Sequence, residues 1–223
     1  LGWGFEQPAI ERMTVRGLPK YDLTDRFAVD GASELVQVAS SAQGPIFRAR
    51  FEGGFVRYTW LSAGAGEGGA WKAEYPDGRV GWFGADKQGV AVPAAQVTAS
   101  ATRIFRWHLV LLEDVYGHQQ RLSYTKDASG SPLLERIDYL FEGASARHSV
   151  RFTYEDRSDV LSDAQPGVEV KLTKRLKELG IFSGTTTPEQ VRRYALEYEP
   201  DTVSGFSTRL RSVTRFGRSG AAY

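Results

Sequence analysis

The chain has 223 residues, of which 41% are hydrophobic and 25% are charged, proportions that are ordinary for a globular protein. Its 28 basic and 27 acidic residues nearly cancel, which disfavours a dedicated nucleic-acid binder, because such proteins carry a basic excess. The absence of cysteine excludes disulfides, thiolate metal ligands and a thiol nucleophile, and no apolar run approaches the length of a membrane span.

Alternating apolar and polar residues predict strands in the N-terminal third. Residues 47–51 alternate aromatic or small side chains with two arginines, and residues 55–60 place Val56, Tyr58 and Trp60 on one face. Both runs are rich in the aromatic and β-branched residues that suit a pleated, half-buried surface. The pair Gly53-Gly54 lies between the runs and predicts a hairpin turn.

Turn signals divide the rest of the chain into further hairpins. The glycine-rich segment 62–70 predicts a flexible loop. Pro76-Asp77-Gly78 predicts a tight hairpin, because proline presets φ and glycine accepts a positive φ. Segments rich in Asp, Gly and Ser mark the next three connections, at residues 113–120, 127–132 and 142–146.

Two later segments show the clearest period of two. In residues 148–155, Val150, Phe152 and Tyr154 fall on one face, and residues 191–199 repeat the pattern. Such alternation is typical of a strand with one half-buried face.

The segment 168–182 fits two local structures. It begins with alternating valines, as in a strand, but three leucines between residues 172 and 179 also fit a helical stripe over residues 171–180. We expect a long strand, because every neighbouring segment reads as a strand, and keep a short helix as the alternative.

These patterns predict an all-β fold: an extended, curved, mostly antiparallel sheet built from successive hairpins, with at most one short helix. We expect roughly eleven to thirteen strands in a single region, 1–223. In it, residues 1–61 form the first strands and hairpins, 62–70 the glycine-rich loop, and 71–223 the later hairpins. Because the chain begins with Leu1 and holds one methionine, we also expect it to be a piece of a longer polypeptide.

The sequence carries no strong signature of catalysis or metal binding. Its three histidines, His108, His118 and His148, lack the spacing of a zinc site. There is no HExxH, no GxSxG nucleophile elbow and no GxxxxGK[ST] phosphate loop. We therefore expect no catalytic residue, no bound metal and no cofactor.

One pair of residues favours an enzyme. Glu197 and Glu199 form the E-x-E pattern of arginine-directed ADP-ribosyltransferases, which need two carboxylates on one face of a strand. The Ser-Thr-Ser strand of such transferases is missing, and two glutamates on the solvent face of a half-exposed strand explain the same pattern. We expect this ordinary solvent face and keep the transferase as an alternative.

Aromatic residues leave a second alternative, a carbohydrate- or receptor-binding β-module in which aromatic side chains line a shallow groove. Their positions in alternating strands favour core packing instead. The arginines of the C-terminal third lie among acidic residues, which indicates a mixed-sign sheet face rather than a nucleic-acid site. The five tryptophans are Trp3, Trp60, Trp71, Trp82 and Trp107.

Short motifs in a fixed order resemble one family of bacterial toxins. Gly2-Trp3-Gly4 is followed by Pro8 to Arg12, Gly17 to Tyr21, Asp25 to Phe27 and Leu35 to Val38. The stretches "FRARFEGGFV", "WKAEYPDGRVGWFG" and "FRWHLVLLEDVYGHQQRLSY" continue the series. This order resembles the family of the Salmonella virulence protein SpvB and the B components of insecticidal Tc toxins. The recurring tyrosine, Asp/Gly turn and Arg-rich strand also resemble the YD, or Rhs, repeats of polymorphic toxins.

The resemblance implies a non-enzymatic structural role. In this family a B component joins a C component in a hollow β-shell, which encloses a cytotoxic domain and docks on a pore-forming A component. We therefore expect this chain to form part of such a shell, with the C component and, through the shell, the A component as partners. The complex would be assembled in the bacterial cytoplasm and secreted. In SpvB the ADP-ribosyltransferase is a separate domain, so its activity is not carried over.

Overall fold

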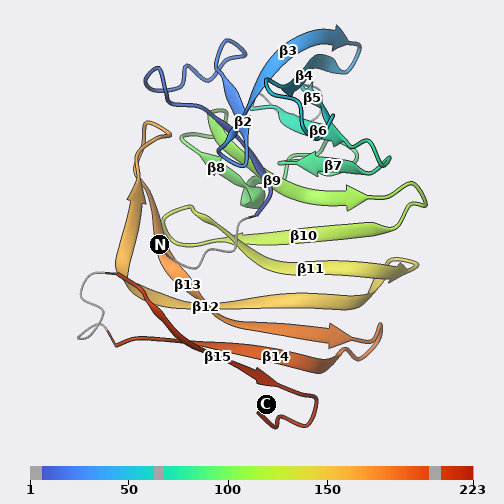
Figure 1. Cartoon of the computed structure of the whole chain (residues 1–223), viewed down its shortest axis with the longest axis vertical. Helices are drawn as coiled ribbons and strands as arrows, with labels where there is room; N and C mark the ends of the chain where they lie inside the picture. The colour runs from blue at the N-terminus through green and yellow to red at the C-terminus, as the bar shows by residue number, and fades with distance from the viewer. Residues whose placement is uncertain (1–6, 63–67, 201–206, 223) are drawn as a thin grey trace. The chain divides into compact units, whose positions relative to one another are not determined.

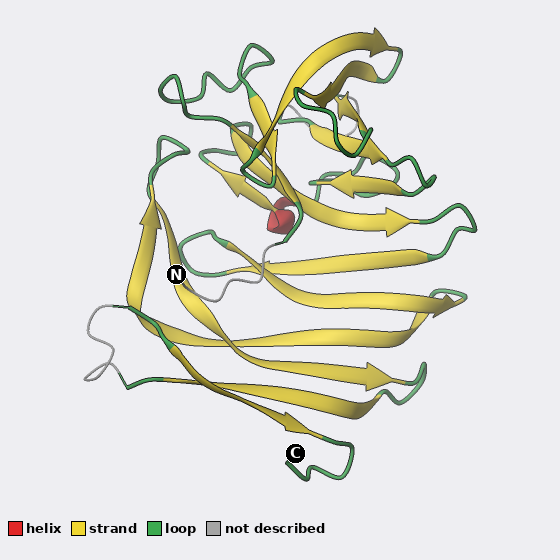
Figure 2. Ribbon diagram, in the orientation of Figure 1, coloured by secondary structure: helices red, strands yellow, loops and turns green. Residues whose placement is uncertain are grey.

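The computed structural model describes residues 7–62, 68–200 and 207–222. In these residues it shows fifteen strands and one three-residue 3₁₀ turn, η1 (Pro93–Ala95), drawn in red in Figure 2. The all-β prediction is therefore confirmed. The strands outnumber the expected count, because some are only three or four residues long and show too little alternation to be recognised. The Gly2-Trp3-Gly4 opening and residues 63–67 of the expected loop lie outside the described residues.

The described chain divides into two compact units. The first, called here the barrel unit, holds the described residues of 7–121 together with 163–170. The second, called the long-strand unit, holds residues 122–162 and the described residues of 171–222.

The strands of the barrel unit form a closed antiparallel ladder. Hydrogen-bonded neighbours follow chain order from β1 to β7 and then reach β9, which also pairs with β1 through Ile10 opposite Trp107. This last pairing closes the ladder and removes its free edges. The bounds are β1 (Ala9–Arg12), β2 (Phe27–Val29), β3 (Ser33–Ser41), β4 (Gly44–Ala49), β5 (Arg57–Leu61), β6 (Ala70–Glu74), β7 (Val80–Phe83), β8 (Gln96–Thr98), which pairs with β9, and β9 (Ile104–Glu113).

An aromatic core fills the barrel unit. Trp71 and Trp107 are fully buried, and their ring centroids lie 6.2 Å apart at an interplanar angle of 79°. Phe27, Phe47 and Trp60 pack around them with centroid separations between 4.9 and 6.2 Å. Edge-to-face geometry of this kind adds to the free energy of simple area burial. The prediction that the tryptophans of the alternating strands pack in the core is confirmed for this cluster.

Close packing around the aromatic core explains why position 84 is a glycine. Gly84 follows β7 with φ +73°, and a Cβ atom there would lie 2.4 Å from Cδ1 of Trp107. Both the backbone conformation and the space therefore require glycine.

The long-strand unit is a meander of long antiparallel strands. Its order is β10 to β15 in sequence, coloured from green to red in Figure 1. Residues 171–180 belong to a strand, so the preferred reading of that segment is confirmed and the helical alternative is wrong. The bounds are β10 (Gln119–Lys126), of which residues 119–121 belong to the barrel unit, β11 (Pro132–Glu142), β12 (Ser145–Asp163), β13 (Val170–Ser183), β14 (Glu189–Tyr198) and β15 (Leu210–Phe216).

One turn geometry recurs at hairpin tips with the sequence Asp-x-x-Gly-x. In the loops that begin at Asp86, Asp114 and Asp127, the aspartate N–H donates to the fifth residue's carbonyl at 2.9 to 3.1 Å. The aspartate Oδ1 accepts the N–H groups of the third and fifth residues. The glycine takes a positive φ, as in a type I turn with a G1 bulge. This explains the predicted turns at 113–120 and 127–132.

The prediction for residues 47–51 was wrong at its C-terminal end. β4 ends at Ala49, and Phe51 is 86% exposed in the loop before β5, where Phe55 is also 66% exposed. In the sequence the alternation continues to Phe51. In the structure the strand ends at Ala49, and Phe51 belongs to the loop before β5 that also contains Gly53-Gly54.

Candidate functional site

The glutamates of the E-x-E pattern lie near the end of β14. Glu197 is exposed near the end of β14 and accepts a hydrogen bond from Ser212 Oγ at 3.1 Å. Glu199 lies beyond the last residue of β14, where its N–H donates to the Arg209 carbonyl at 2.9 Å. The register shift between β14 and β15 falls at this point: Glu197 pairs with Ser212 and Tyr198 with Leu210, so the extra residue, Arg211, belongs to β15.

The three histidines have different surroundings. His118 Nδ1 lies 2.8 Å from the Asp114 carboxylate, which accepts a hydrogen bond in a hairpin tip, and the tilted His148 and Tyr139 rings have centroids 5.5 Å apart. His108 lies on β9, where burial, with a smaller effect from the positive charge of Arg106, lowers its pKa to about 3. Within the described ranges, no three His, Asp or Glu side chains gather in a group that could hold a metal.

The four tryptophans that the structure describes are buried rather than placed along a surface groove. Trp60, Trp71, Trp82 and Trp107 are between 0 and 6% exposed, while Trp3 lies outside the described residues. Trp107 Nε1 donates to the Gly69 carbonyl at 3.0 Å, so this indole also uses its polar atom inside the protein. An aromatic carbohydrate platform therefore finds no support in these four side chains.

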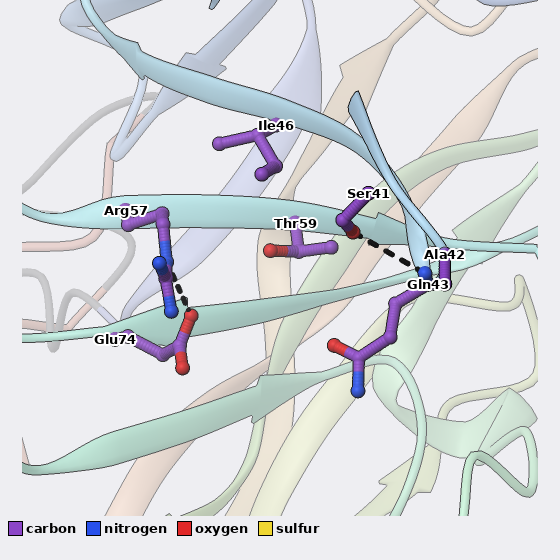
Figure 3. Close-up of a pocket in the computed structure, with 7 residues that line it drawn as sticks. All are labelled: Ser41, Ala42, Gln43, Ile46, Arg57, Thr59 and Glu74. Carbon is purple, nitrogen blue, oxygen red and sulfur yellow. Dashed lines mark hydrogen bonds and ion pairs between the residues drawn. The ribbon is translucent and has the colours of Figure 1, made fainter. Parts of the chain in front are cut away.

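A small polar hollow opens beside the β3–β4 turn (Figure 3). Across it, Arg57 Nε donates to the Glu74 carboxylate at 2.7 Å from the adjacent strand. The same hydrogen bond is the main reason that the pKa of Glu74 lies below its usual value. The charged groups satisfy each other, and the remaining lining residues are Ser41, Ala42, Gln43, Ile46 and Thr59. The hollow holds no base positioned to activate a nucleophile.

The most elaborate polar arrangement in the barrel unit is a buried arginine node. Arg12, at the end of β1, is 3% exposed. Its Nε donates to the Ile104 carbonyl at 2.9 Å, and its Nη1 donates at 2.7 Å to both the Asp22 carbonyl and the Asp25 carboxylate. The guanidinium carbon lies between 5.0 and 5.4 Å from three ring centroids, those of Tyr21, Phe27 and Trp107.

Asp25 completes the node from the loop between β1 and β2. Its two oxygens accept the N–H groups of Lys20 and Tyr21 at 2.9 and 2.8 Å. Burial lowers the pKa of Arg12, and the attraction of Asp25 opposes that effect. The Tyr21 hydroxyl donates to the Pro166 carbonyl, which fixes residues 163–170 against this loop. Three of the motif blocks, Pro8–Arg12, Gly17–Tyr21 and Asp25–Phe27, therefore meet at one structural node.

A second group of hydrogen-bonded polar residues, the Asp127 node, connects two segments of the long-strand unit. Asp127 Oδ2 accepts the N–H and the hydroxyl of Thr173 at 3.2 and 3.0 Å, while Oδ1 serves the turn. Ser131 Oγ donates to the Lys171 carbonyl at 2.7 Å. Burial alone would raise the pKa of Asp127, but hydrogen bonds from Ser129, Thr173 and Ser131 lower it overall. This carboxylate ties a hairpin tip to the start of β13.

Arginine–aromatic stacking links successive strands of this unit. Arg151 on β12 lies 4.1 Å from the ring centroid of Phe182 on β13. Arg175 on β13 lies 4.2 Å from that of Tyr198 on β14, and Arg193 on β14 lies 4.0 Å from that of Phe216 on β15. Among the described residues of this unit, few apolar side chains are buried, namely Leu122, Tyr124, Leu133, Leu134 and Phe152. Stacked arginines therefore supply much of the cross-strand contact.

The Arg12 and Asp127 side chains thus hold loops and strands of the fold together. Sequence patterns did not reveal the Arg12 and Asp127 nodes, because their partners lie up to 92 residues away. One feature of the sequence could have indicated the Arg12 node. In the strand "AIER", Arg12 follows Ile10 by two residues and so shares its inward face. No helix in the described part of the chain is long and apolar enough to cross a membrane.

Comparison with known proteins decides the family. The model of the SpvB family, described as Salmonella virulence plasmid 65kDa B protein, matches residues 1–151, more than half of the chain. The chain belongs to the SpvB family. The resemblance expected from the motif order is confirmed. A search of curated proteins finds no match.

Solved structures share the fold of this SpvB family member. The N-terminal domain of effector protein SpvB from Salmonella typhimurium strain LT2 matches with TM-score 0.82 and 17% identity, over 97% of this chain and 88% of that chain. The TcdB2-TccC3-Cdc42 structure matches with TM-score 0.81 and 20% identity, over 100% of this chain and 14% of that chain. The Tc holotoxin pore of Photorhabdus luminescens matches with TM-score 0.82 and 19% identity, over the same shares.

Proposed function

We propose that the chain is a non-enzymatic structural component of a bacterial toxin complex. In this role it forms part of a hollow β-shell that encloses a cytotoxic domain and helps to deliver it. The main support for this proposal is that the whole chain matches 14% of a chain in the TcdB2-TccC3-Cdc42 structure. The match to an N-terminal domain of SpvB supports it as well.

The polar groups of the chain support a role without catalysis. The buried charges of Arg12, Asp25 and Asp127 are saturated by hydrogen bonds from the protein itself. A catalytic carboxylate needs a free face toward a substrate, and these carboxylates use theirs to hold loops. Glu197 is exposed and accepts a hydrogen bond from Ser212, and Glu199 lies beyond the last residue of β14, as expected for an ordinary solvent face.

The partners follow from the same proposal. A C component of the TccC3 kind would complete the shell, and a pore-forming A component would receive the assembled particle. The complex would assemble in the bacterial cytoplasm and act after secretion, without binding nucleic acid. SpvB-family membership and the Tc toxin matches support this environment.

Co-expression tests the proposal directly. The chain is produced with the remaining part of a B component and its C partner, and the product is analysed by size-exclusion chromatography and limited proteolysis. We expect a soluble particle in which the chain resists protease. A chain that stays a stable monomer, which the partners neither bind nor protect, contradicts the shell role and favours an independent binding module.

A further inference from the structure

The loop between β1 and β2, residues 13–26, presents apolar side chains at the surface of the barrel unit. Leu18 lies against the tip of the β12–β13 hairpin, because a Cβ atom added at Gly167 would lie 3.8 Å from Leu18 Cδ1. That tip belongs to the same unit. A concentration of exposed apolar side chains on one segment is a feature of interaction sites. The aliphatic side chains of the loop and the tip that are between 40 and 68% exposed are Val15, Leu18, Leu23 and Val168.

Hydrogen bonds hold the loop in one conformation. Asp25 accepts the N–H groups of Lys20 and Tyr21 at 2.9 and 2.8 Å. The buried Arg12 side chain in turn holds the Asp25 carboxylate. The Tyr21 hydroxyl donates to the Pro166 carbonyl in the hairpin tip. A partner that binds here therefore does not have to order the loop, and such preorganisation favours affinity.

Three cations lie on or beside this loop. Arg16, Lys20 and Arg103 are exposed, and none of them forms an ion pair with a carboxylate in the described part of the chain. The Arg103 guanidinium carbon lies 5.8 Å from the Tyr21 ring centroid, which places this side chain next to the loop. The surface therefore combines aliphatic groups with cations that are available to a partner.

The other charges of the loop are largely compensated within the protein. Arg26 donates to the Glu34 carboxylate at 2.6 Å, and Asp25 pairs with Arg12. Asp22 carries the remaining negative charge of residues 13–26. Three cations without an ion pair thus stand against one such anion, a local excess in a chain whose net charge is only +1.

Aliphatic groups among unpaired cations fit a protein segment that has both apolar side chains and carboxylates. Complementary charge of this kind supplies specificity and speeds association. A second copy of this chain fits poorly, because a two-fold dimer would bring the same surface patch, and hence like charges, face to face.

A surface of anionic lipids also fits less well. Recognition of such a surface typically uses clusters of about four to eight Lys and Arg residues, each contributing about 1 kcal/mol. This loop surface has three cations, and Asp22 beside them would be repelled by a uniformly anionic plane. A protein segment can instead place its carboxylates opposite the cations alone.

We propose that the loop between β1 and β2 docks an acidic segment with apolar side chains from a neighbouring protein of the toxin complex. This assignment rests on the proposed function, because that function supplies the neighbour. The apolar side chains of the segment would cover the exposed aliphatic groups, and its carboxylates would pair with Arg16, Lys20 and Arg103.

Photo-crosslinking identifies the docked segment. Leu18 is replaced by p-benzoylphenylalanine, and the chain is produced with the remaining part of a B component and its C partner. Crosslinked peptides are then identified by mass spectrometry. We expect one main crosslink, to a segment that contains apolar residues and an excess of Asp and Glu. A crosslink to a segment without an acidic excess, or no crosslink in an assembled particle, overturns the assignment.

Tryptic cleavage reports on the same surface without any substitution. The bond between Arg16 and Gly17 should be cut in the isolated chain, since exposed loops are preferred sites of proteolysis. In the assembled particle this cleavage should be roughly tenfold slower or more, because the docked segment covers the loop. Equal rates of cleavage in the isolated chain and in the particle overturn the assignment.

Charge reversal tests the pairing. In competition with the wild-type chain, Arg16→Glu with Lys20→Glu should enter the particle roughly tenfold less, and Lys substitutions in the crosslinked acidic segment should restore entry. Such restoration needs a folded chain, so it excludes misfolding as the cause. The control Arg209→Glu with Arg211→Glu changes the net charge equally, at exposed positions of the long-strand unit, and should enter like the wild type. An equal loss in the control, or no restoration, overturns the assignment.

Vesicles test the membrane alternative. The chain should stay in the supernatant when vesicles with about one third phosphatidylserine are sedimented. Binding to these vesicles that Arg16→Glu with Lys20→Glu abolishes would assign the loop to a lipid surface and overturn the protein partner.

The assignment can fail separately from the shell role. If a protected particle forms while the loop stays open to trypsin, the docking assignment is wrong and the shell role stands. If Leu18 crosslinks to an acidic segment of one partner but no closed particle forms, docking stands and the shell role is wrong. If the partners neither crosslink nor assemble with the chain, both are wrong.

Discussion

The Arg12 guanidinium lies 2.7 Å from the Asp25 carboxylate, and the two side chains are only 3% and 8% exposed. The pair fastens the loop between β1 and β2 to the barrel, since Arg12 also reaches the Ile104 carbonyl on β9. A buried pair of this kind is not in itself a gain in stability, because both charges lose water. Removing one partner is costly, however, because the other charge remains buried.

The first prediction concerns this pair. Arg12→Met should lower the free energy of unfolding by about 3–5 kcal/mol, because Asp25 and the Ile104 carbonyl lose their buried donor. Arg12→Lys keeps the charge but not the planar fork, so its loss should be smaller. Urea unfolding followed by tryptophan fluorescence measures both. Equal stability of the wild type and Arg12→Met would contradict the structural role of the node.

Much of the fold could be predicted from local patterns. Period-two alternation and turn chemistry are local, and they located the strands around residues 148–155 and 191–199 and the hairpin at Asp77-Gly78. The segment 171–180 could not be settled locally, because its leucines satisfy both periods. Its strand conformation depends on pairing with β14, where Leu179 lies opposite Tyr194.

The polar nodes could not be predicted, because they depend on tertiary contacts. Nothing local distinguishes Asp127 from Asp114, since both begin the same Asp-x-x-Gly turn. Only the fold brings Thr173 to the second oxygen of Asp127. Barrel closure also depends on a long-range contact, because β1 pairs with β9, which lies almost a hundred residues further along the sequence. Motif order revealed the family, but it did not reveal that Arg12 is buried.

The second prediction compares these two aspartates. Asp127→Ala removes a carboxylate that serves both the turn and Thr173, and it should cost about 2–3 kcal/mol in unfolding free energy. Asp114→Ala is the control: it removes the same turn contacts, together with a contact to the exposed His118 ring, and should cost about 1 kcal/mol. Chemical denaturation of the two variants measures the difference. If both cost the same, the contact with Thr173 contributes nothing.

The Asp127 node also predicts acid sensitivity. Its pKa is lowered in the folded state from an ordinary value of 3.8, so the stabilisation is present above that value. It should be lost as the pH falls through the lower folded-state pKa. Asp127→Asn should therefore unfold with a shallower dependence on acid than the wild type, as circular dichroism at decreasing pH would measure. An unchanged acid profile would contradict this.

The third prediction concerns His108 at milder pH. Its folded-state pKa of about 3 lies below the ordinary 6.5, so the unfolded chain binds a proton that the folded chain excludes. Stability should therefore fall as the pH drops below 6.5, by about 1 kcal/mol between pH 6.5 and 5.5. Carboxylates hardly titrate in this window. Denaturation series at the two pH values should show this loss in the wild type but not in His108→Leu; a loss of the same size in the variant would implicate another group.

The fourth prediction tests the absence of transferase chemistry. Glu197→Gln with Glu199→Gln should leave the activity of a parent toxin unchanged, because Glu197 is exposed and accepts a hydrogen bond from Ser212, and Glu199 lies beyond the end of β14. The measurement is NAD hydrolysis and transfer of labelled ADP-ribose by the purified proteins. Activity in the wild-type chain that disappears in the double variant would establish an enzyme.

The fifth prediction concerns the stacking that links the long strands. Arg193 lies 4.0 Å from the Phe216 ring centroid, directly opposite it across β14 and β15, and also holds the Glu178 carboxylate. Phe216→Leu keeps an apolar contact but removes the aromatic face, and Arg193→Lys keeps the charge but removes the planar guanidinium. A double-mutant cycle of these two changes should give a coupling of about 0.5–1 kcal/mol, the range for a partly exposed cation–π pair. Unfolding of the four proteins in urea measures it. Additive effects would mean that the stack contributes only its buried area, and that the ion pair with Glu178 alone fixes Arg193.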